Sequence, residues 1–99
     1  MAMVGGLGKS KPADEALQTL CDQVRPEVEA REGRTFSTFT AVECKTQVVS
    51  GTNYFIKVQV SDDEFIHVRV HKALPHEQGK LTLSACQGGK TKQDEILHF

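Results

Sequence analysis

The chain lacks several features that would assign it to a common functional class. None of its apolar runs approaches the roughly eighteen residues of a membrane-spanning helix. Its 12 basic and 13 acidic residues are scattered and give a net charge of −1, so no basic block indicates nucleic-acid binding. Residues 1–8 are uncharged and interrupted by glycine, which is not the pattern of a signal peptide. We expect neither a membrane nor a nucleic acid as partner.

The cysteines fit neither a disulfide scaffold nor a zinc site. Cys21, Cys44 and Cys86 are odd in number, and no two of them form a close C-x-x-C pair. Reduced thiols in a cytosolic setting are the simplest interpretation. We therefore expect a cytoplasmic location, with the nucleus as a second compartment. Cys86 ends a predicted strand and is a candidate for an intermolecular disulfide.

What the chain does contain suffices for one small core. Its 99 residues fit a single domain over residues 1–99, and 38% hydrophobic with 25% charged residues is the composition of an ordinary globular domain. Residues 1–12 show no periodicity and end in a proline. We expect them to form a flexible N-terminal arm.

The first periodic segment predicts a helix over residues 14–32. Apolar residues at steps of three and four define one helical face: Leu17, Leu20, Cys21, Val24 and Val28. Asp14 offers an N-cap oxygen and Gly33 a natural end. Pro26 interrupts this segment, so the sequence allows one bent helix or two short helices that meet at Pro26. The apolar face keeps its phase across the proline, which favours the bent helix.

After Gly33 the apolar period becomes two, which is typical of strands. Four strands are expected, with these apolar faces: Val42, Cys44 and Thr46; Tyr54, Ile56, Val58 and Val60; Ile66, Val68 and Val70; Leu81, Leu83 and Ala85. Polar residues between them, such as Lys57 and His67, indicate that the other face of an antiparallel sheet meets solvent. The predicted fold is α+β: one long N-terminal α-helix wrapped by a four- to five-stranded antiparallel β-sheet.

The polar residues do not form a recognisable metal or catalytic site. His67 and His71 share a strand face but lie about 13 Å apart along it, too far to bind one zinc ion. The adjacent acids at residues 62–64 lack the spaced ligands of a calcium loop. Nothing marks a nucleophile with an orienting residue and an oxyanion hole. We expect no enzymatic activity and no cofactor.

Two valines stand where a turn usually carries polar residues. Val48 and Val49 directly precede Ser50 and Gly51. Neighbouring strand residues face opposite ways, so Val48 continues the face of Cys44 and is either buried in the core or presented by the loop, whereas Val49 points outward or lies at the tip. Gly51 allows a positive φ or the close approach of another surface. Exposed apolar side chains beside such a glycine indicate a contact site.

The segment Gln-Val-Val-Ser-Gly at residues 47–51 resembles the Q-x-V-x-G loop of cystatins, which inhibit papain-like cysteine proteases. Four further segments resemble the stefin branch, or type 1 cystatins: residues 52–58, the Gly-Gly-Leu at 5–7, the Leu-Pro-His-Glu at 74–77 and the ending 94–99. Together they cover essentially the whole chain in order. Ser50 departs from the alanine common in stefins, and three cysteines exceed what that branch usually contains.

The resemblance implies a cystatin-like fold in which an N-terminal arm and two hairpin loops align as a wedge that enters the protease cleft. It assigns protease binding to these residues: Gly5, Gly6, Gln47, Val48, Val49, Ser50, Gly51, Leu74, Pro75 and His76. The implied partners of the monomer are papain-like proteases of the cathepsin L, S, H and B type. Two alternatives stay open. One is a self-associating module in which the first loop extends and two chains form a domain-swapped dimer. The other is an enzyme on the same broad architecture.

Overall fold

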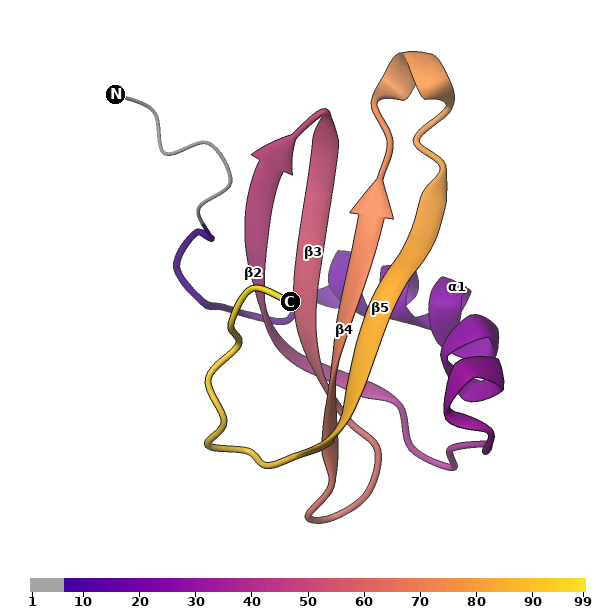
Figure 1. Ribbon diagram of the computed structural model, residues 1–99, viewed down its shortest axis with the longest axis vertical. Helices are drawn as coiled ribbons and strands as arrows, with labels where there is room; N and C mark the ends of the chain where they lie inside the picture. Colours follow the sequence, from indigo (N-terminus) through magenta and orange to yellow (C-terminus); the bar gives the residue numbers. More distant parts are fainter. Residues whose placement is uncertain (1–6) are drawn as a thin grey trace.

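A computed structural model describes residues 7–99, and these form one α-helix and one antiparallel sheet of five strands (Figure 1). The sheet order is β1-β2-β3-β4-β5, so each strand pairs with its neighbours in sequence. The elements are β1 Lys11–Pro12, α1 Glu15–Glu32, β2 Thr40–Val49, β3 Gly51–Gln59, β4 Phe65–Lys72, the 3-10 helix η1 Pro75–Glu77 and β5 Leu81–Lys90. The predicted α+β fold is confirmed.

The helix α1 runs through Pro26 as one element, so the alternative of two short helices is wrong. Oδ1 of Asp14 accepts a hydrogen bond from the Leu17 N–H at 2.8 Å. At the other end Gly33, with φ of 71°, donates its N–H to the carbonyl of Glu29. Pro26 lies on the exposed side, and no helix in residues 7–99 is long and apolar enough to cross a membrane.

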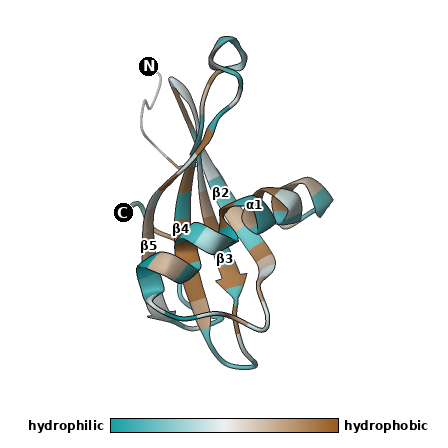
Figure 2. Cartoon of the chain, turned by 90° about the vertical axis from the view of Figure 1, so that its right-hand side faces the viewer, coloured by the Kyte–Doolittle hydropathy of each residue, from teal (hydrophilic) through white to brown (hydrophobic). Residues whose placement is uncertain are grey.

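The main core lies between α1 and one face of the sheet (Figures 1 and 2). The helix contributes the face predicted from its periodicity: Leu17, Leu20, Cys21, Val24 and Val28. The central strands contribute β-branched residues such as Ile56, Val58 and Val70, all fully buried. Phe36 and Phe39, with ring centroids 5.7 Å apart, close this core beside the end of the helix. The helix-covered face therefore follows the apolar pattern of the sequence.

The start of β2 departs from the predicted alternation. A bulge between Ala41 and Glu43 inserts one extra residue against β3. Ala41 and Cys44 are both buried in the core against the helix, whereas Val42 lines a groove with Phe65 on the other side of the sheet. The prediction that Val42 shares the face of Cys44 is wrong, because the extra residue reverses the alternation.

The second face of the sheet is covered, so the prediction that it meets solvent is wrong. The C-terminal segment 91–99, which we call the strap, crosses this face opposite α1 (Figure 1). Lys57 Nζ donates to the carbonyls of Lys92 at 2.6 Å and Asp94 at 2.7 Å. Lys57 is 2% exposed and His67 only 1% exposed, although both were expected to be solvated.

Further along its course the strap is held by aromatic and backbone contacts. Lys45 Nζ donates to the Ile96 carbonyl at 2.7 Å, and Ile96 is completely buried. The Phe55 ring lies 5.6 Å from that of Phe99, edge to face, and Arg69 donates to the Phe99 carbonyl. A segment without apolar periodicity thus closes a second, smaller core.

The described beginning of the chain lies along the edge of the sheet. The Gly8 N–H donates to the Thr46 carbonyl at 2.9 Å, and β1 pairs antiparallel with β2. The sequence did not indicate a strand before the helix. Because the two segments are antiparallel, the arm comes closer to the turn between β2 and β3 as it is followed from Pro12 back to Gly8.

Candidate functional site

Two loops lie together at one end of the sheet (Figure 1). The first loop, residues 47–51, joins β2 to β3, and the second loop, residues 73–80, joins β4 to β5. An open groove of about 720 Å³ runs between them, with Val48 and Val49 among its lining on one side and Leu74 on the other. The two predicted hairpin loops therefore contribute to one continuous surface.

The first loop presents apolar side chains to solvent. Val48 is 77% exposed and Val49 is 38% exposed. Val48 lies opposite Thr52, two residues along β3 from Tyr54, so it does continue the helix-side face of β2. Of the two possibilities for Val48, burial in the core is nevertheless wrong, because α1 covers only the lower part of that face and the strands extend beyond it (Figure 2).

Gly51 cannot be substituted without a change in the first loop. Its φ of 96° is in the left-handed region, and a Cβ there would stand 2.4 Å from the Lys72 carbonyl oxygen and 3.1 Å from His71 Nε2. Any side chain at Gly51 would therefore push β3 away from β4. The glycine serves a close approach inside the sheet, and this approach fixes where the turn stands.

Gln47 lies at the base of the first loop rather than at its tip. It is 5% exposed, and its Oε1 accepts a hydrogen bond from Asn53 Nδ2 at 2.8 Å. Asn53 Oδ1 in turn lies 2.9 Å from Nδ1 of His71. Sequence reasoning missed Asn53 and His71 as partners of Gln47, because their contact depends on how β3 pairs with β2 and β4.

The second loop has a short 3-10 helix at its tip. The Gln78 N–H donates to the Pro75 carbonyl at 2.9 Å, and positive φ angles of 67° at Gln78 and 58° at Gly79 return the chain to β5. Pro75 and His76 are exposed, and Leu74 is half-buried at the groove. The loop thus carries its three predicted contact residues on or beside the shared surface.

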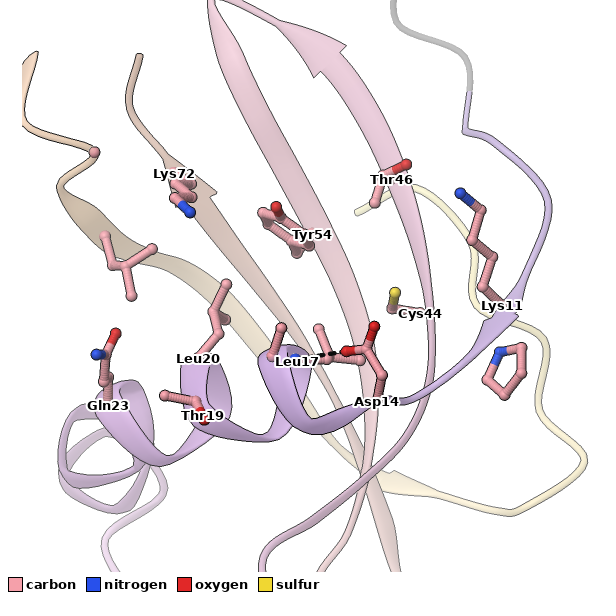
Figure 3. A pocket seen from close by; sticks show the side chains of 14 residues that line it. Lys11, Asp14, Leu17, Thr19, Leu20, Gln23, Cys44, Thr46, Tyr54 and Lys72 are labelled. Atoms are coloured by element: carbon pink, nitrogen blue, oxygen red, sulfur yellow. Dashed lines mark hydrogen bonds between the residues drawn. The ribbon is translucent and has the colours of Figure 1, made fainter. Parts of the chain in front are cut away.

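A second groove, of about 690 Å³, lies below the loops between α1 and the sheet (Figure 3). Its lining includes Leu17 and Leu20 from the helix and Tyr54 from β3, while Lys11 and Lys72 stand on opposite sides of it. Among residues 7–99, no group of three or more histidine, cysteine or acidic side chains could hold a metal ion.

The three cysteines are free thiols without the features of a nucleophile. Burial raises the pKa of Cys21 to about 12 and also raises the pKa of Cys44. Burial and the carboxylate of Glu32, 3.6 Å from Sγ, raise the pKa of Cys86, which is half-buried. A thiol that stays protonated is a weak nucleophile, so none of the three is activated.

Comparison with known proteins agrees with this architecture. The family described as Cystatin domain matches residues 5–93. Cystatin-B of Sus scrofa is 47% identical over 97 residues, which cover 98% of this chain and 99% of that protein. Cystatin-B of Homo sapiens is 48% identical over the same coverage, and Cystatin-A of Felis catus is 45% identical over 95 residues, 96% of this chain and 97% of that protein. The chain therefore belongs to the cystatin family, in its stefin branch, and is a cysteine protease inhibitor rather than an enzyme.

Proposed function

We propose that the chain is a tight, reversible and non-covalent inhibitor of papain-like cysteine proteases that blocks the active-site cleft with its N-terminal arm and two loops. The observation that carries the proposal is the shared surface of the loops, with Val48 and Val49 facing Leu74 and Pro75 across one groove. Burying such apolar surface contributes about 25 cal/mol per Å² before association costs.

The two loops are already shaped in the free protein, which supports tight binding. Gly51 locks the first loop against β4, and the 3-10 helix shapes the second. Loops that are ordered before binding lose less conformational entropy in the complex. Inhibition then requires no reaction with the catalytic thiol of the protease, because the loops need only fill the cleft beside it.

The N-terminal arm is the third element of the proposal. Its described part is paired to β2 as far as Gly8, which bonds to Thr46 next to the first loop. Gly5 and Gly6 lie outside the described residues. We place them as an extended strand in the substrate groove of the protease, where backbone pairing would hold them and a side chain would collide with the wall.

The proposed partners are proteases of the cathepsin L, S, H and B type. A wedge of two loops fits an open cleft better than a cleft narrowed by an occluding segment, so we expect endopeptidases to bind more tightly than exopeptidases. An interface of about 800 Å² per partner is typical of protease–inhibitor pairs. Inhibition constants for this panel, measured side by side, test the ranking.

We also propose a cytoplasmic location, with the nucleus as a second compartment. The support is chemical: Cys21, Cys44 and Cys86 are all free thiols, which suits a reducing compartment. Fractionation of cells that express the chain, followed by immunoblotting, tests the location. Recovery from the medium or secretory vesicles alone would contradict it.

Titration of papain with this protein tests the inhibitory function directly. We expect residual activity to fall linearly to an equivalence point near one inhibitor per active site, with no consumption of the inhibitor. Val49→Asp should weaken inhibition by several kcal/mol, roughly, because it puts a charge into a desolvated contact. Ala30→Asp, at an exposed position of α1, is the matched control and should inhibit like the parent. Unchanged inhibition by Val49→Asp would remove the first loop from the interface.

Deletion of residues 1–5 tests the arm. We expect weaker inhibition of papain, mainly through faster dissociation, because the arm is ordered on binding and adds contacts that hold the complex. Association and dissociation rates from progress curves separate the two effects. Rates equal to those of the full chain would reject a role for the arm.

Self-association through the first loop is the competing possibility. The turn is a single residue, Ser50, between the paired Val49 and Gly51, and a straightened turn would join β2 and β3 into one long strand that two chains could exchange. Size-exclusion chromatography, with each fraction titrated against papain, separates the two readings. A monomer that inhibits beside an inactive dimer supports inhibition by the free loop, whereas activity confined to the dimer contradicts it.

A further inference from the structure

We propose that His71, on β4, is a positioning residue for the first loop. In this arrangement its Nδ1–H holds Asn53, Asn53 holds Gln47, and its ring supports the backbone at Gly51. The inference rests on the proposed function, because it concerns the loop that would enter the protease cleft. It adds a residue outside both loops to the machinery of inhibition.

The three polar side chains form one row across three strands. Gln47 of β2 lies opposite Asn53 of β3, and Asn53 lies opposite His71 of β4. The adjacent row on the same face contains Arg69, which donates to the Phe99 carbonyl at the end of the strap. The row of Gln47, Asn53 and His71 therefore stands between the strap and the turn, where it ties the three strands together just below the first loop.

The hydrogen-bond directions fix the tautomer of His71. Asn53 donates through Nδ2 to Gln47 Oε1 at 2.8 Å, which leaves its Oδ1 facing His71 Nδ1 at 2.9 Å. An amide oxygen only accepts hydrogen bonds, so Nδ1 of the neutral ring must carry the proton and Nε2 must be unprotonated.

The far edge of the same ring supports the turn. A Cβ built on Gly51 would lie 3.1 Å from both Cε1 and Nε2 of His71. The ring therefore occupies the space beside Gly51 that a side chain there would enter. Because Ser50 alone separates Gly51 from Val49, a shift of Gly51 moves the valines that the loop presents. His71 acts on the loop in two separable ways, through a hydrogen bond and through the bulk of its ring.

Two substitutions separate these contributions. His71→Phe keeps a planar ring and removes the donor, whereas His71→Asn keeps an N–H donor at the place of Nδ1 and removes the outer part of the ring. The matched control is Gln59→Leu at the other end of β3, which removes the hydrogen bond from Gln59 Nε2 to the Ser61 carbonyl at 3.0 Å. Each variant changes one side chain on the same sheet.

Stopped-flow association with papain and dissociation by displacement give the test. We expect His71→Phe to dissociate about fivefold faster than the parent with nearly unchanged association, the size of one lost hydrogen bond. His71→Asn, which loses only the outer part of the ring, should dissociate about twofold faster than the parent, and Gln59→Leu should match the parent. The midpoints of thermal unfolding of His71→Phe and Gln59→Leu should be close, which separates positioning from a general loss of stability.

The ring nitrogens give a readout that does not depend on inhibition. Long-range ¹⁵N–¹H spectra at a pH where the ring is neutral should show His71 protonated on Nδ1, and a ring protonated on Nε2 would overturn the inference. Parent-like dissociation of His71→Phe, with papain still inhibited, would also overturn it and leave the proposed function standing. If the parent does not inhibit papain at all, the proposed function fails, and the inference fails with it.

Discussion

The two faces of the sheet are buried by different chemistry. The face under α1 is closed by apolar side chains, with Val28, Ile56 and Val70 fully buried. The face under the strap contains buried polar groups, with Lys57 and His67 at 2% and 1% exposure. The difference shows that alternation of polar and apolar residues along a strand does not by itself decide which face meets water, because a polar side chain can be buried against a backbone that accepts its hydrogen bonds.

The strap face buries two basic side chains: Lys57, whose charge is balanced by hydrogen bonds, and His67, which is held neutral. Lys57 Nζ binds two strap carbonyls and lies 3.5 Å from Glu43 Oε1. Burial, together with the charges of Lys57 and Lys90, lowers the pKa of His67 to about 4, against the weaker opposing effects of Asp94 and Glu43. Its Nε2 is buried without a hydrogen-bond partner among the described residues. The packing on the strap face should therefore lose more stability on acidification than the packing on the helix face.

The largest expected effect compares one isoleucine from each face. Ile56 and Ile96 are both fully buried, yet Ile56 is enclosed between helix and sheet whereas Ile96 belongs to the strap. Ile56→Ala should lower the free energy of unfolding by about 4 kcal/mol, and Ile96→Ala by about 2 kcal/mol, because the strap can settle into the space left behind. Urea unfolding of both variants measures the difference. Equal losses would mean that the two faces are packed with equal rigidity.

Acidification should affect the strap face next. The folded pKa of His67, about 4, lies below its ordinary value of 6.5, so between these pH values the unfolded chain binds a proton that the folded chain does not. Stability is therefore complete above pH 6.5 and falls as the pH drops toward 4, by up to about 3 kcal/mol. Urea unfolding at half-unit pH steps measures the slope.

A non-titrating ring provides the control for that slope. In His67→Phe the fall between pH 6.5 and 4.5 should largely disappear. The N–H groups of Phe36 and Thr91 lower the pKa values of Glu29 and Asp94, respectively, so the stability due to these carboxylates is lost only at still lower pH. A variant with the slope of the parent would place the pH dependence elsewhere.

The smallest of the three effects should be local to the strap. Lys57→Met removes the donor to the carbonyls of Lys92 and Asp94 while keeping most of the buried stem. We expect a loss of about 1–2 kcal/mol, because the two carbonyls can regain water when the strap lifts. Hydrogen exchange should quicken at the Asp94 amide, which donates to the Thr91 carbonyl, and stay unchanged in α1. Faster exchange throughout the helix would show that the strap and main core open as one unit.

The sequence predicted the helix-covered half of the fold closely, because each of its signals is local. The N-cap at Asp14, the end at Gly33 and the apolar face from Leu17 to Val28 all depend on neighbours within a few residues. The bulge at Ala41 could not be predicted, since it depends on how β2 pairs with β3. The burial of Lys57 could not be predicted either, because its partners come from a segment about 35 residues later that has no period.

The candidate site shows the same division between local and long-range signals. The turn at Gly51 and the exposed tip at Val49 follow from adjacent residues, and the structure places both loops at one end. The sequence left the burial of Val48 open, because the extent of α1 along the sheet decides it. The row that links Gln47 to His71 requires the register of three strands, which no short motif contains.

The simple order of the sheet has a consequence for the path by which the chain folds. From β2 onward each strand pairs with the one before it, so these three hairpins can form from their own turns, whereas β1 pairs with β2 only across the intervening helix. The strap is different, since Lys45, Lys57 and Arg69, which anchor it, sit on three separate strands. Its docking site exists only after those strands have assembled, so the strap should dock after the sheet has formed.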